Sequence, residues 1–182
     1  MNQSEPQKKS VRKRKTAAPL VIGWREVVSL PDLGLSDFRA KIDTGARTSA
    51  LHALRIEPLE REGHPWVRFA PPDLGHGAPA WVEAPLIERR AIKNTSGVPE
   101  DRYVIRTHLQ LASRRFLIEV ALANRGDMAF PMIIGRTAIR GHGLLVDCGR
   151  SWLTRRKSAL RRSIEPTDAQ PHPTDERPQE RP

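Results

Sequence analysis

Two runs in which large apolar side chains recur at every second position, between residues 103 and 122, constrain the fold more than any other feature of this chain. The apolar members are Tyr103, Ile105, Leu109 and Leu111 in the first run, and Phe116, Ile118, Val120 and Leu122 in the second. A period of two places alternate side chains on opposite faces of a strand. The short Ala112-Ser113-Arg114 turn between the runs therefore predicts a β-hairpin with one buried face.

Further short apolar runs, separated by turn residues, predict more strands. We expect strands within 21–28, 38–43, 66–69, 81–87, 132–134 and 144–146, and a single helical turn within 136–140. Long segments with the helical period are absent. An all-β domain follows, and we favour a small closed or partly closed β-barrel with one short helix, although strand signals alone do not exclude a sandwich.

The two ends of the chain differ in composition from its middle. Residues 1–19 hold six Lys and Arg against one acid, and residues 155–182 hold seven against five acids together with five Pro. Segments with high charge and few apolar side chains cannot offset the entropy of ordering. We therefore expect disordered tails over 1–19 and 155–182, and one folded domain over 20–154.

Most of the formal net charge of +10 belongs to these tails, because the middle of the chain contributes only +3. The basic tails would make at most weak contact with nucleic acid, by releasing counterions. Within 20–154 the basic residues are sixteen Arg but only two Lys, Lys41 and Lys93. Arg is the residue that suits bidentate pairing with carboxylates and phosphates.

The chain has one cysteine, Cys148, which excludes an intrachain disulfide and fits a reducing compartment. The apolar stretch after the basic N-terminus is too short for a signal peptide, and no apolar run reaches the ~20 residues of a membrane span. We therefore expect a soluble protein of the cytoplasm without membrane contact.

A carboxylate on a tight turn is the feature that points to chemistry. Asp43 ends the predicted 38–43 strand and is followed by Thr44, Gly45 and Ala46. Gly permits the tight turn, and Thr can hydrogen-bond neighbouring backbone and hold it rigid. Such a triplet alone is ordinary turn chemistry. The downstream Ile133-Ile134-Gly135-Arg136 segment strengthens the interpretation, because a second apolar-apolar-Gly segment can support the turn from behind.

The two motifs together resemble the retropepsins, the aspartic peptidases of retroviruses. The match is closer to a bacterial family of retropepsin-like peptidases, whose members are often labelled ATP-dependent zinc proteases. The segments that carry this resemblance are 41–53 (KIDTGARTSALHA), Asn124-Arg125, 128–136 (MAFPMIIGR) and 144–147 (LLVD). The resemblance covers residues 20–154. It implies an aspartic endopeptidase in which Asp43 is catalytic and Thr44, Gly45 and Ala46 support its turn.

The resemblance also implies a homodimer, with one Asp43 from each subunit. Two carboxylates that lie close together share a proton, so that one activates a water while the other polarises the scissile carbonyl. Within one chain, the alternative second carboxylate is Asp147 in Asp147-Cys148-Gly149. We expect Asp147 instead to satisfy backbone donors or to pair with an arginine.

Neither cofactor in the family label finds support in the sequence. There is no His-Glu-x-x-His pair and no thiolate cluster for zinc. There is also no Gly-x-x-x-x-Gly-Lys-Ser/Thr loop for ATP. We therefore assign no metal and no other cofactor.

The arginines suggest an acidic peptide substrate. Arg47 and Arg136 should lie within about 10–15 Å of Asp43 by chain reach, and Arg125 is a further candidate for substrate binding. Other positive candidates are Arg89, Arg90, Lys93, Arg102 and Arg106. Retroviral relatives carry acidic residues where this chain has Arg47, so Arg136 needs another partner. The family resemblance suggests an oligo-glutamate chain, because such peptidases are associated with glutamate-ligase systems that add glutamate tails to proteins.

Three assignments remain open at the level of sequence. His52 would orient substrate or respond to pH, or be a structural histidine. The polar loop at 93–99 is a candidate cover for the cleft, but the sequence does not decide which hairpin is the flap. The alternative function is a non-catalytic module on the same fold that binds acidic peptide or RNA. Such a module would have no need of the Asp43 carboxylate.

Overall fold

The structure, a computed structural model, describes residues 18–75, 77–93, 97–126 and 128–154. The predicted tails at 1–19 and 155–182 lie outside these residues, apart from residues 18 and 19. The strands are β1 (Leu20–Gly23), β2 (Arg25–Leu30), β3 (Leu35–Asp43), β4 (Ser49–His52), β5 (Leu54–Arg61), β6 (His64–Ala70), β7 (Val82–Lys93), β8 (Pro99–Leu111), β9 (Arg114–Ala123), β10 (Met132–Gly135) and β11 (Leu144–Asp147). A 3-10 turn, η1 (Pro31–Leu33), follows β2, and one short helix, α1 (Arg136–Gly141), follows β10.

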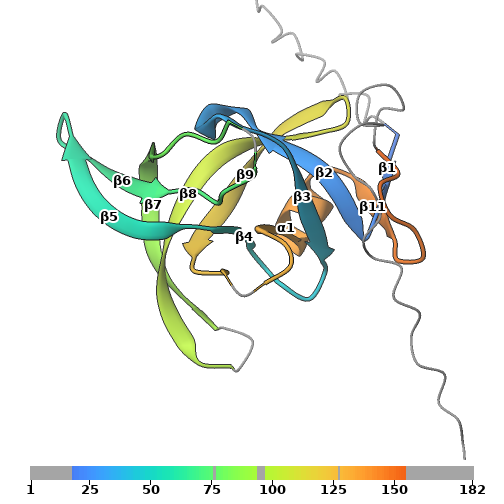
Figure 1. Cartoon of the computed structure of the whole chain (residues 1–182). Helices are drawn as coiled ribbons and strands as arrows, with labels where there is room; N and C mark the ends of the chain where they lie inside the picture. Colours follow the sequence, from blue (N-terminus) through green and yellow to red (C-terminus); the bar gives the residue numbers. More distant parts are fainter. Residues whose placement is uncertain (1–17, 76, 94–96, 127, 155–182) are drawn as a thin grey trace, which may run out of the picture.

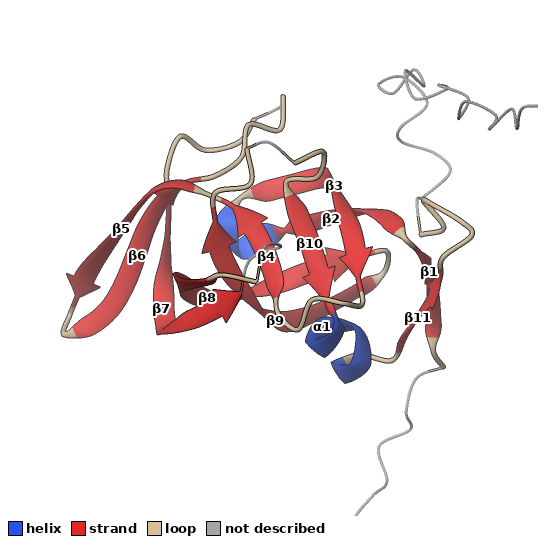
Figure 2. Cartoon of the chain, turned by 90° about the horizontal axis from the view of Figure 1, so that it is seen from below, coloured by secondary structure: helices blue, strands red, loops and turns tan. Residues whose placement is uncertain are grey.

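The main sheet folds back on itself, which confirms the predicted partly closed, all-β architecture (Figures 1 and 2). Its strand order is β2-β3-β10-β4-β9-β8-β7-β6-β5, and β2 also pairs with β8. The six strands from β2 to β8 therefore form a ring, which closes through the pairs Val28–Leu111 and Ser29–Gln110. Strands β7, β6 and β5 continue the sheet outward from this ring as a curved wing.

The interior of the ring is filled by the apolar side chains that alternation predicts. On β3, Phe38, Ala40 and Ile42 are buried while Arg39 and Lys41 are exposed. On β8 and β9 the buried set includes Ile105, Leu109, Leu111, Ile118, Val120 and Leu122. Each fully buried side chain of this size contributes about 1.5–3 kcal/mol. The predicted hairpin is therefore confirmed, with a loop of only Ala112 and Ser113, because Arg114 already belongs to β9.

The predicted strand over 21–28 is wrong as a single element. The chain bends at Trp24, so that β1 pairs in parallel with β11 in a separate two-stranded sheet while β2 enters the ring. The bend is held by the backbone of the C-terminal segment, because Trp24 N donates to Arg150 O at 2.9 Å. A Cβ on Gly23 would lie only 2.5 Å from Arg150 O, so this close approach requires glycine.

The prediction also missed β4 and β5 and ended β7 too early. Ser49, Ala50 and Leu51 of β4 are all buried, so that strand shows no alternation. Strand β5 and the outer half of β7 are mostly exposed and charged, and therefore carry little apolar signal. Helix α1, in contrast, lies where the helical turn was predicted and buries Ala138 and Ile139. Among the described residues, no helix combines the length and apolar character needed to cross a membrane.

Candidate active site

Asp43 ends β3 on a turn that holds its carboxylate in place. One oxygen, Oδ1, accepts hydrogen bonds from Gly45 N at 3.0 Å and from Ala46 N at 3.1 Å. The other oxygen receives no hydrogen bond from the described residues. Gly45 approaches closely, since a Cβ there would lie 3.3 Å from Oδ1. The exposed Thr44 makes no side-chain hydrogen bond to any described residue, so the expected bracing of the turn by Thr44 is not seen.

Strand β10 supports this turn from behind, as the motif pair predicts. The strand runs parallel to β3 and aligns Gly135 with Asp43. Gly135 N donates to Ser49 Oγ at 3.1 Å. A Cβ at Gly135 would lie 2.6 Å from the carbonyl carbon of Thr48, which is closer than real Cβ atoms come. The two chain segments therefore pack backbone against backbone, and only glycine fits between them.

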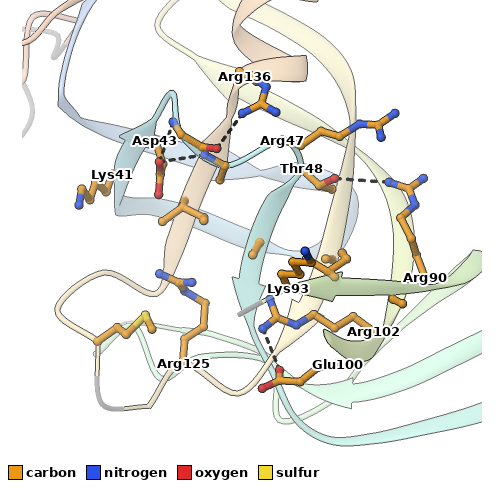
Figure 3. A pocket seen from close by; sticks show the side chains of 18 of the residues that line it. Lys41, Asp43, Arg47, Thr48, Arg90, Lys93, Glu100, Arg102, Arg125 and Arg136 are labelled. Carbon is orange, nitrogen blue, oxygen red and sulfur yellow. Dashed lines mark hydrogen bonds and ion pairs between the residues drawn. The ribbon is translucent and has the colours of Figure 1, made fainter. Parts of the chain in front are cut away.

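Arg136 ties the same turn to the start of α1. Its backbone N donates to Ala46 O at 2.9 Å, and its Nη1 donates to Gly45 O at 2.7 Å (Figure 3). Next to it, Thr137 donates from both its N and its Oγ1 to Arg47 O, at 3.2 and 2.8 Å. The side chain of Arg136 thus binds a backbone carbonyl of the turn and not a carboxylate. This geometry makes it a positioning residue of the Asp43 turn.

A groove of about 1000 Å³ opens beside Asp43 (Figure 3). It lies between the Asp43 turn, the outer ends of β7 and β8, and the segment that joins β9 to β10. Most of the charged side chains that line it are cationic. They are Lys41, Arg47, Arg90, Lys93, Arg102, Arg125 and Arg136, against the carboxylates of Asp43 and Glu100. Seven cations with two carboxylates make the groove electropositive, which favours anionic ligands.

Some of these cations already have partners within the chain. Arg90 donates from Nη2 to Glu119 at 3.0 Å and also to Glu88, and its Nη1 lies 3.4 Å from Thr48 Oγ1. These carboxylates raise the pKa of Arg90, chiefly through the hydrogen bond that Arg90 donates to Glu119. Arg102 donates from Nη2 to Glu100 at 2.8 Å. Arg90 is therefore paired with two carboxylates, and Arg102 with one.

Arg125 differs, because its half-buried side chain makes no hydrogen bond or ion pair with a described residue. Its Nε is buried without an acceptor. Burial lowers the pKa of Arg125, the charge of Arg102 lowers it further, and Asp43 opposes both. Figure 3 shows the guanidinium reaching from the β9–β10 segment toward the Asp43 side of the groove. Arg125 therefore lines the same groove as Asp43, and its role in substrate binding stays a prediction.

His52 is not among the residues that line the groove, and it contacts the backbone of Arg125. Its Nδ1 accepts a hydrogen bond from Arg125 N at 2.8 Å, so the ring is neutral in this arrangement. Burial, and then the charge of Arg125, lower the pKa of His52 below its ordinary value. Among the roles left open for His52, this position favours a structural one over contact with substrate. His52 instead fixes the backbone that carries Arg125.

The remaining arginines that were predicted from sequence separate into two groups. Arg47 and Lys93 line the groove with exposed side chains, and Arg90 lines it with a half-buried one. Arg89 and Arg106 lie outside the lining, where Arg89 pairs with Asp101 at 3.4 Å. Arg106 lies 3.5 Å from Glu119. Sequence reasoning missed Lys41, Glu100 and the Met128 side chain as lining residues, because strand-end positions far apart in sequence carry no shared signal.

Asp147, the alternative second carboxylate, has its own partners. Its Oδ1 accepts from Gly149 N at 3.0 Å, and its Oδ2 accepts from Arg150 Nε at 2.7 Å. These hydrogen bonds lower its pKa, with that from Arg150 first. Asp147 is not among the lining residues of the groove. The expectation that it satisfies backbone donors and pairs with an arginine is confirmed.

The described residues contain no cluster of three or more His, Cys, Asp or Glu side chains that could hold a metal ion.

Curated relatives match a large part of this chain but only a small part of their own length. A "Probable alpha-L-glutamate ligase" from Parasynechococcus marenigrum (strain WH8102) is 41% identical over 130 residues, which are 70% of this chain and 28% of that protein. A protein of the same name from Desulfotalea psychrophila is 39% identical over 132 residues, or 71% and 28% of the two chains. The chain thus spans less than a third of these relatives.

Two solved structures are also similar. A Legionella pneumophila protein of unknown function is 29% identical, with a TM-score of 0.65 over 75% of this chain and 98% of that chain. The protease of EIAV in complex with an inhibitor is 14% identical, with a TM-score of 0.39 over 75% and 99%.

A family model matches residues 21–157, which include every strand except the first residue of β1. The model describes the retropepsin-like aspartic endopeptidase RimB. The predicted family resemblance is therefore confirmed, and the chain belongs to the RimB-like family of retropepsin-like aspartic endopeptidases.

Proposed function

We propose that this protein is an aspartic endopeptidase that hydrolyses peptide bonds in acidic, glutamate-rich peptides, with an active site formed by two copies of Asp43. The observation that carries the proposal is the Asp43 turn. One carboxylate oxygen is held by two backbone N–H groups at the wall of an open groove, and the other is free of partners among the described residues. Membership of the RimB-like family supports this role for that carboxylate.

The chemistry needs a second carboxylate. When two carboxylates lie close together, their mutual repulsion leaves one protonated, and the pair titrates as a unit. The ionised member takes a proton from water as that water attacks the scissile carbonyl, and the protonated member hydrogen-bonds the carbonyl oxygen. Such general acid–base help contributes about 10²–10⁴-fold in rate.

A homodimer supplies this second carboxylate most simply. Asp147 is bonded to Arg150 and lies outside the groove. Glu100 lines the groove but is held by Arg102. We therefore assign the partner carboxylate to Asp43 of a second copy. The exposed position of Thr44 and Gly45 is compatible with contact to that copy.

The substrate class rests on charge and on the relatives. Seven cationic side chains line the groove, and an acidic peptide would neutralise them. The relatives named as probable glutamate ligases contain a segment similar to this chain within a longer protein. A peptidase domain joined to such a ligase would act on glutamate-containing chains. We place this activity in the cytoplasm, the reducing compartment that the single cysteine fits.

Asp43→Asn tests the catalytic assignment. The substitution keeps the shape of the turn but removes the ionisable group, so we expect cleavage of an oligo-glutamate peptide to fall at least about 100-fold while peptide binding persists. Asp147→Asn is the matched control, because it makes the same chemical change on a similar turn outside the groove. We expect it to retain activity. Equal cleavage by the Asp43→Asn variant and the unsubstituted protein would contradict the assignment of Asp43, and binding without cleavage by both would support the binding-module alternative.

Mixing the two proteins tests the shared site. If subunits exchange at random, adding Asp43→Asn chains converts active dimers into heterodimers with one carboxylate. Activity should fall to about one half at equal amounts and to about one tenth at a nine-fold excess of the variant. Light scattering should give the mass of a dimer. Cleavage that is unaffected by the excess variant, from a chain of monomer mass, would contradict the two-copy site.

A further inference from the structure

Two guanidinium groups in the groove, those of Arg102 and Arg125, are short of hydrogen-bond acceptors. In each, the Nε atom is buried without a partner among the described residues. The Arg102 side chain is only 15% exposed, and Arg125 is half-buried. Buried N–H donors without acceptors are uncommon in proteins because their desolvation is not compensated. Both side chains line the same groove as Asp43.

The charges around the pair are also unbalanced. Glu100 accepts a hydrogen bond from Arg102 Nη2 at 2.8 Å, while Arg102 Nε has no acceptor among the described residues. Arg125 has no ion pair with a described residue, and its pKa is lowered first by burial and then by repulsion from the charge of Arg102. Arg90, across the groove, is instead saturated by Glu88 and Glu119. Arg102 and Arg125 are therefore the two cations of the groove whose guanidinium groups have a buried Nε without an acceptor among the described residues.

The backbone that carries Arg125 is fixed before any ligand binds. His52 Nδ1 accepts from Arg125 N at 2.8 Å, and Arg125 O accepts from Met128 N at 2.9 Å. Gly126 N donates to Asn124 Oδ1 at 3.1 Å. A guanidinium on a held backbone loses little freedom on binding, so its interaction with a ligand is retained as affinity.

We propose that Arg125, together with the Nε side of Arg102, forms a subsite that binds one side-chain carboxylate of the peptide substrate next to Asp43. This inference rests on the proposed function and identifies the residues that select a glutamate beside the scissile bond. A planar guanidinium fork matches the geometry of a carboxylate, and charge-assisted hydrogen bonds of this kind are among the strongest in proteins. The subsite distinguishes glutamate from glutamine, because only the carboxylate neutralises the pair.

A nucleic-acid backbone suits this position less well. The two carboxylates of the groove, Asp43 and Glu100, lie among the cations and would repel a continuous chain of phosphates. An isolated carboxylate needs only the Arg102–Arg125 position. The relatives named as glutamate ligases also favour an acidic peptide over RNA.

Peptide binding, measured apart from cleavage, tests the subsite. The full chain carrying Asp43→Asn would be titrated with fluorescein-labelled tetraglutamate and tetraglutamine, and the fluorescence anisotropy recorded. Adding Arg125→Gln should weaken tetraglutamate binding about 10- to 100-fold and leave tetraglutamine binding within about two-fold. Arg102→Gln should give a smaller loss in the same direction, because Glu100 already holds part of that group.

Arg89→Gln is the matched control. It removes the same charge from strand β7, but Arg89 is 60% exposed, pairs with Asp101 and lies outside the groove. We expect its effect on tetraglutamate binding to stay within about two-fold, as screening of an exposed charge requires. Arg125→Lys serves as a second variant, which keeps the charge and loses the fork, and should bind with intermediate affinity. Circular dichroism and thermal unfolding would check that each variant folds.

The possible outcomes separate this inference from the proposed function. Equal losses from Arg125→Gln and Arg89→Gln would overturn the subsite, as would equal affinity for the two peptides or tighter binding of a short oligoribonucleotide through Arg125. If Arg125 is needed for tetraglutamate binding but the unsubstituted chain cleaves no peptide, the subsite stands and the peptidase proposal fails. If the unsubstituted chain and Arg125→Gln cleave with the same preference for glutamate over glutamine, the peptidase stands and the subsite fails.

Discussion

Adding a single methyl group at Gly135 should disturb the active site from behind. In Gly135→Ala the new Cβ would lie 2.6 Å from Thr48 C and 2.8 Å from both Thr48 O and Ser49 N. Ordinary contact begins near 3.4 Å, and the three obstructing atoms all belong to the backbone. No side chain can rotate away, so the segment that follows the Asp43 turn must move.

The expected loss in the free energy of unfolding has two contributions, one from steric crowding and one from a strained hydrogen bond. Forcing an extra methyl group into a packed interior costs about 1–3 kcal/mol. The shift also strains the hydrogen bond from Gly135 N to Ser49 Oγ, and net contributions of this kind are about 0.5–1.5 kcal/mol. We therefore expect the free energy of unfolding to fall by about 3 kcal/mol. For a domain of this size, the melting temperature should drop by roughly 10 °C.

Thermal and urea unfolding of Gly135→Ala would measure this loss, and Gly141→Ala is the matched control. A Cβ on Gly141 meets nothing within 4 Å, so that variant should unfold within about 0.5 kcal/mol of the unsubstituted chain. Peptide cleavage should fall in the Gly135 variant even at temperatures where it is folded, because the Asp43 turn has moved. A loss below about 1 kcal/mol with full cleavage activity would refute the reasoning.

Three further predictions concern single side chains. The fully buried Glu26 accepts hydrogen bonds from Gly23 N, Leu153 N and both donors of Thr154. Glu26→Gln should therefore lower the unfolding free energy by about 2–3 kcal/mol in urea titrations, and no change would refute this role. Because folding lowers the pKa of His52, stability should decline as pH falls below its ordinary pKa of 6.5. His52→Phe should flatten that decline between pH 6.5 and 5 in thermal unfolding, and an unaltered profile would contradict it. Arg136→Met removes the hydrogen bond to Gly45 O and should lower kcat more than it raises KM; unchanged kinetics would exclude positioning by Arg136.

The strands that could be predicted are those with one face toward the core and the other face toward solvent. Strand β3 and the β8–β9 hairpin show this alternation, because each has one buried face and one exposed face. Strand β4 is buried on both faces, and β5 is exposed on both. Neither arrangement produces a period of two, which explains why both strands were missed.

The candidate site shows a similar division. Asp43, Gly45 and Gly135 could be identified because a tight turn and a backbone-to-backbone contact restrict which residues are allowed. The role of His52 could not, because its partner is the backbone N of Arg125, 73 positions away in the sequence. The 21–28 segment was likewise misjudged, because its bend is imposed by Arg150 from the other end of the domain.

The sequence by itself determined that the domain is all-β, that its family is retropepsin-like and that a single carboxylate sits on a glycine turn. These properties depend on local periodicity and on local backbone geometry, and both are determined by residues that are neighbours in the sequence. Only the tertiary structure decided which arginines are free to bind a ligand. Arg90 and Arg125 look alike in sequence, yet Glu88 and Glu119 saturate the first, while the fold leaves the Nε of the second without an acceptor among the described residues. Whether a charge is paired depends on which strands the sheet brings together, and sequence order does not record that.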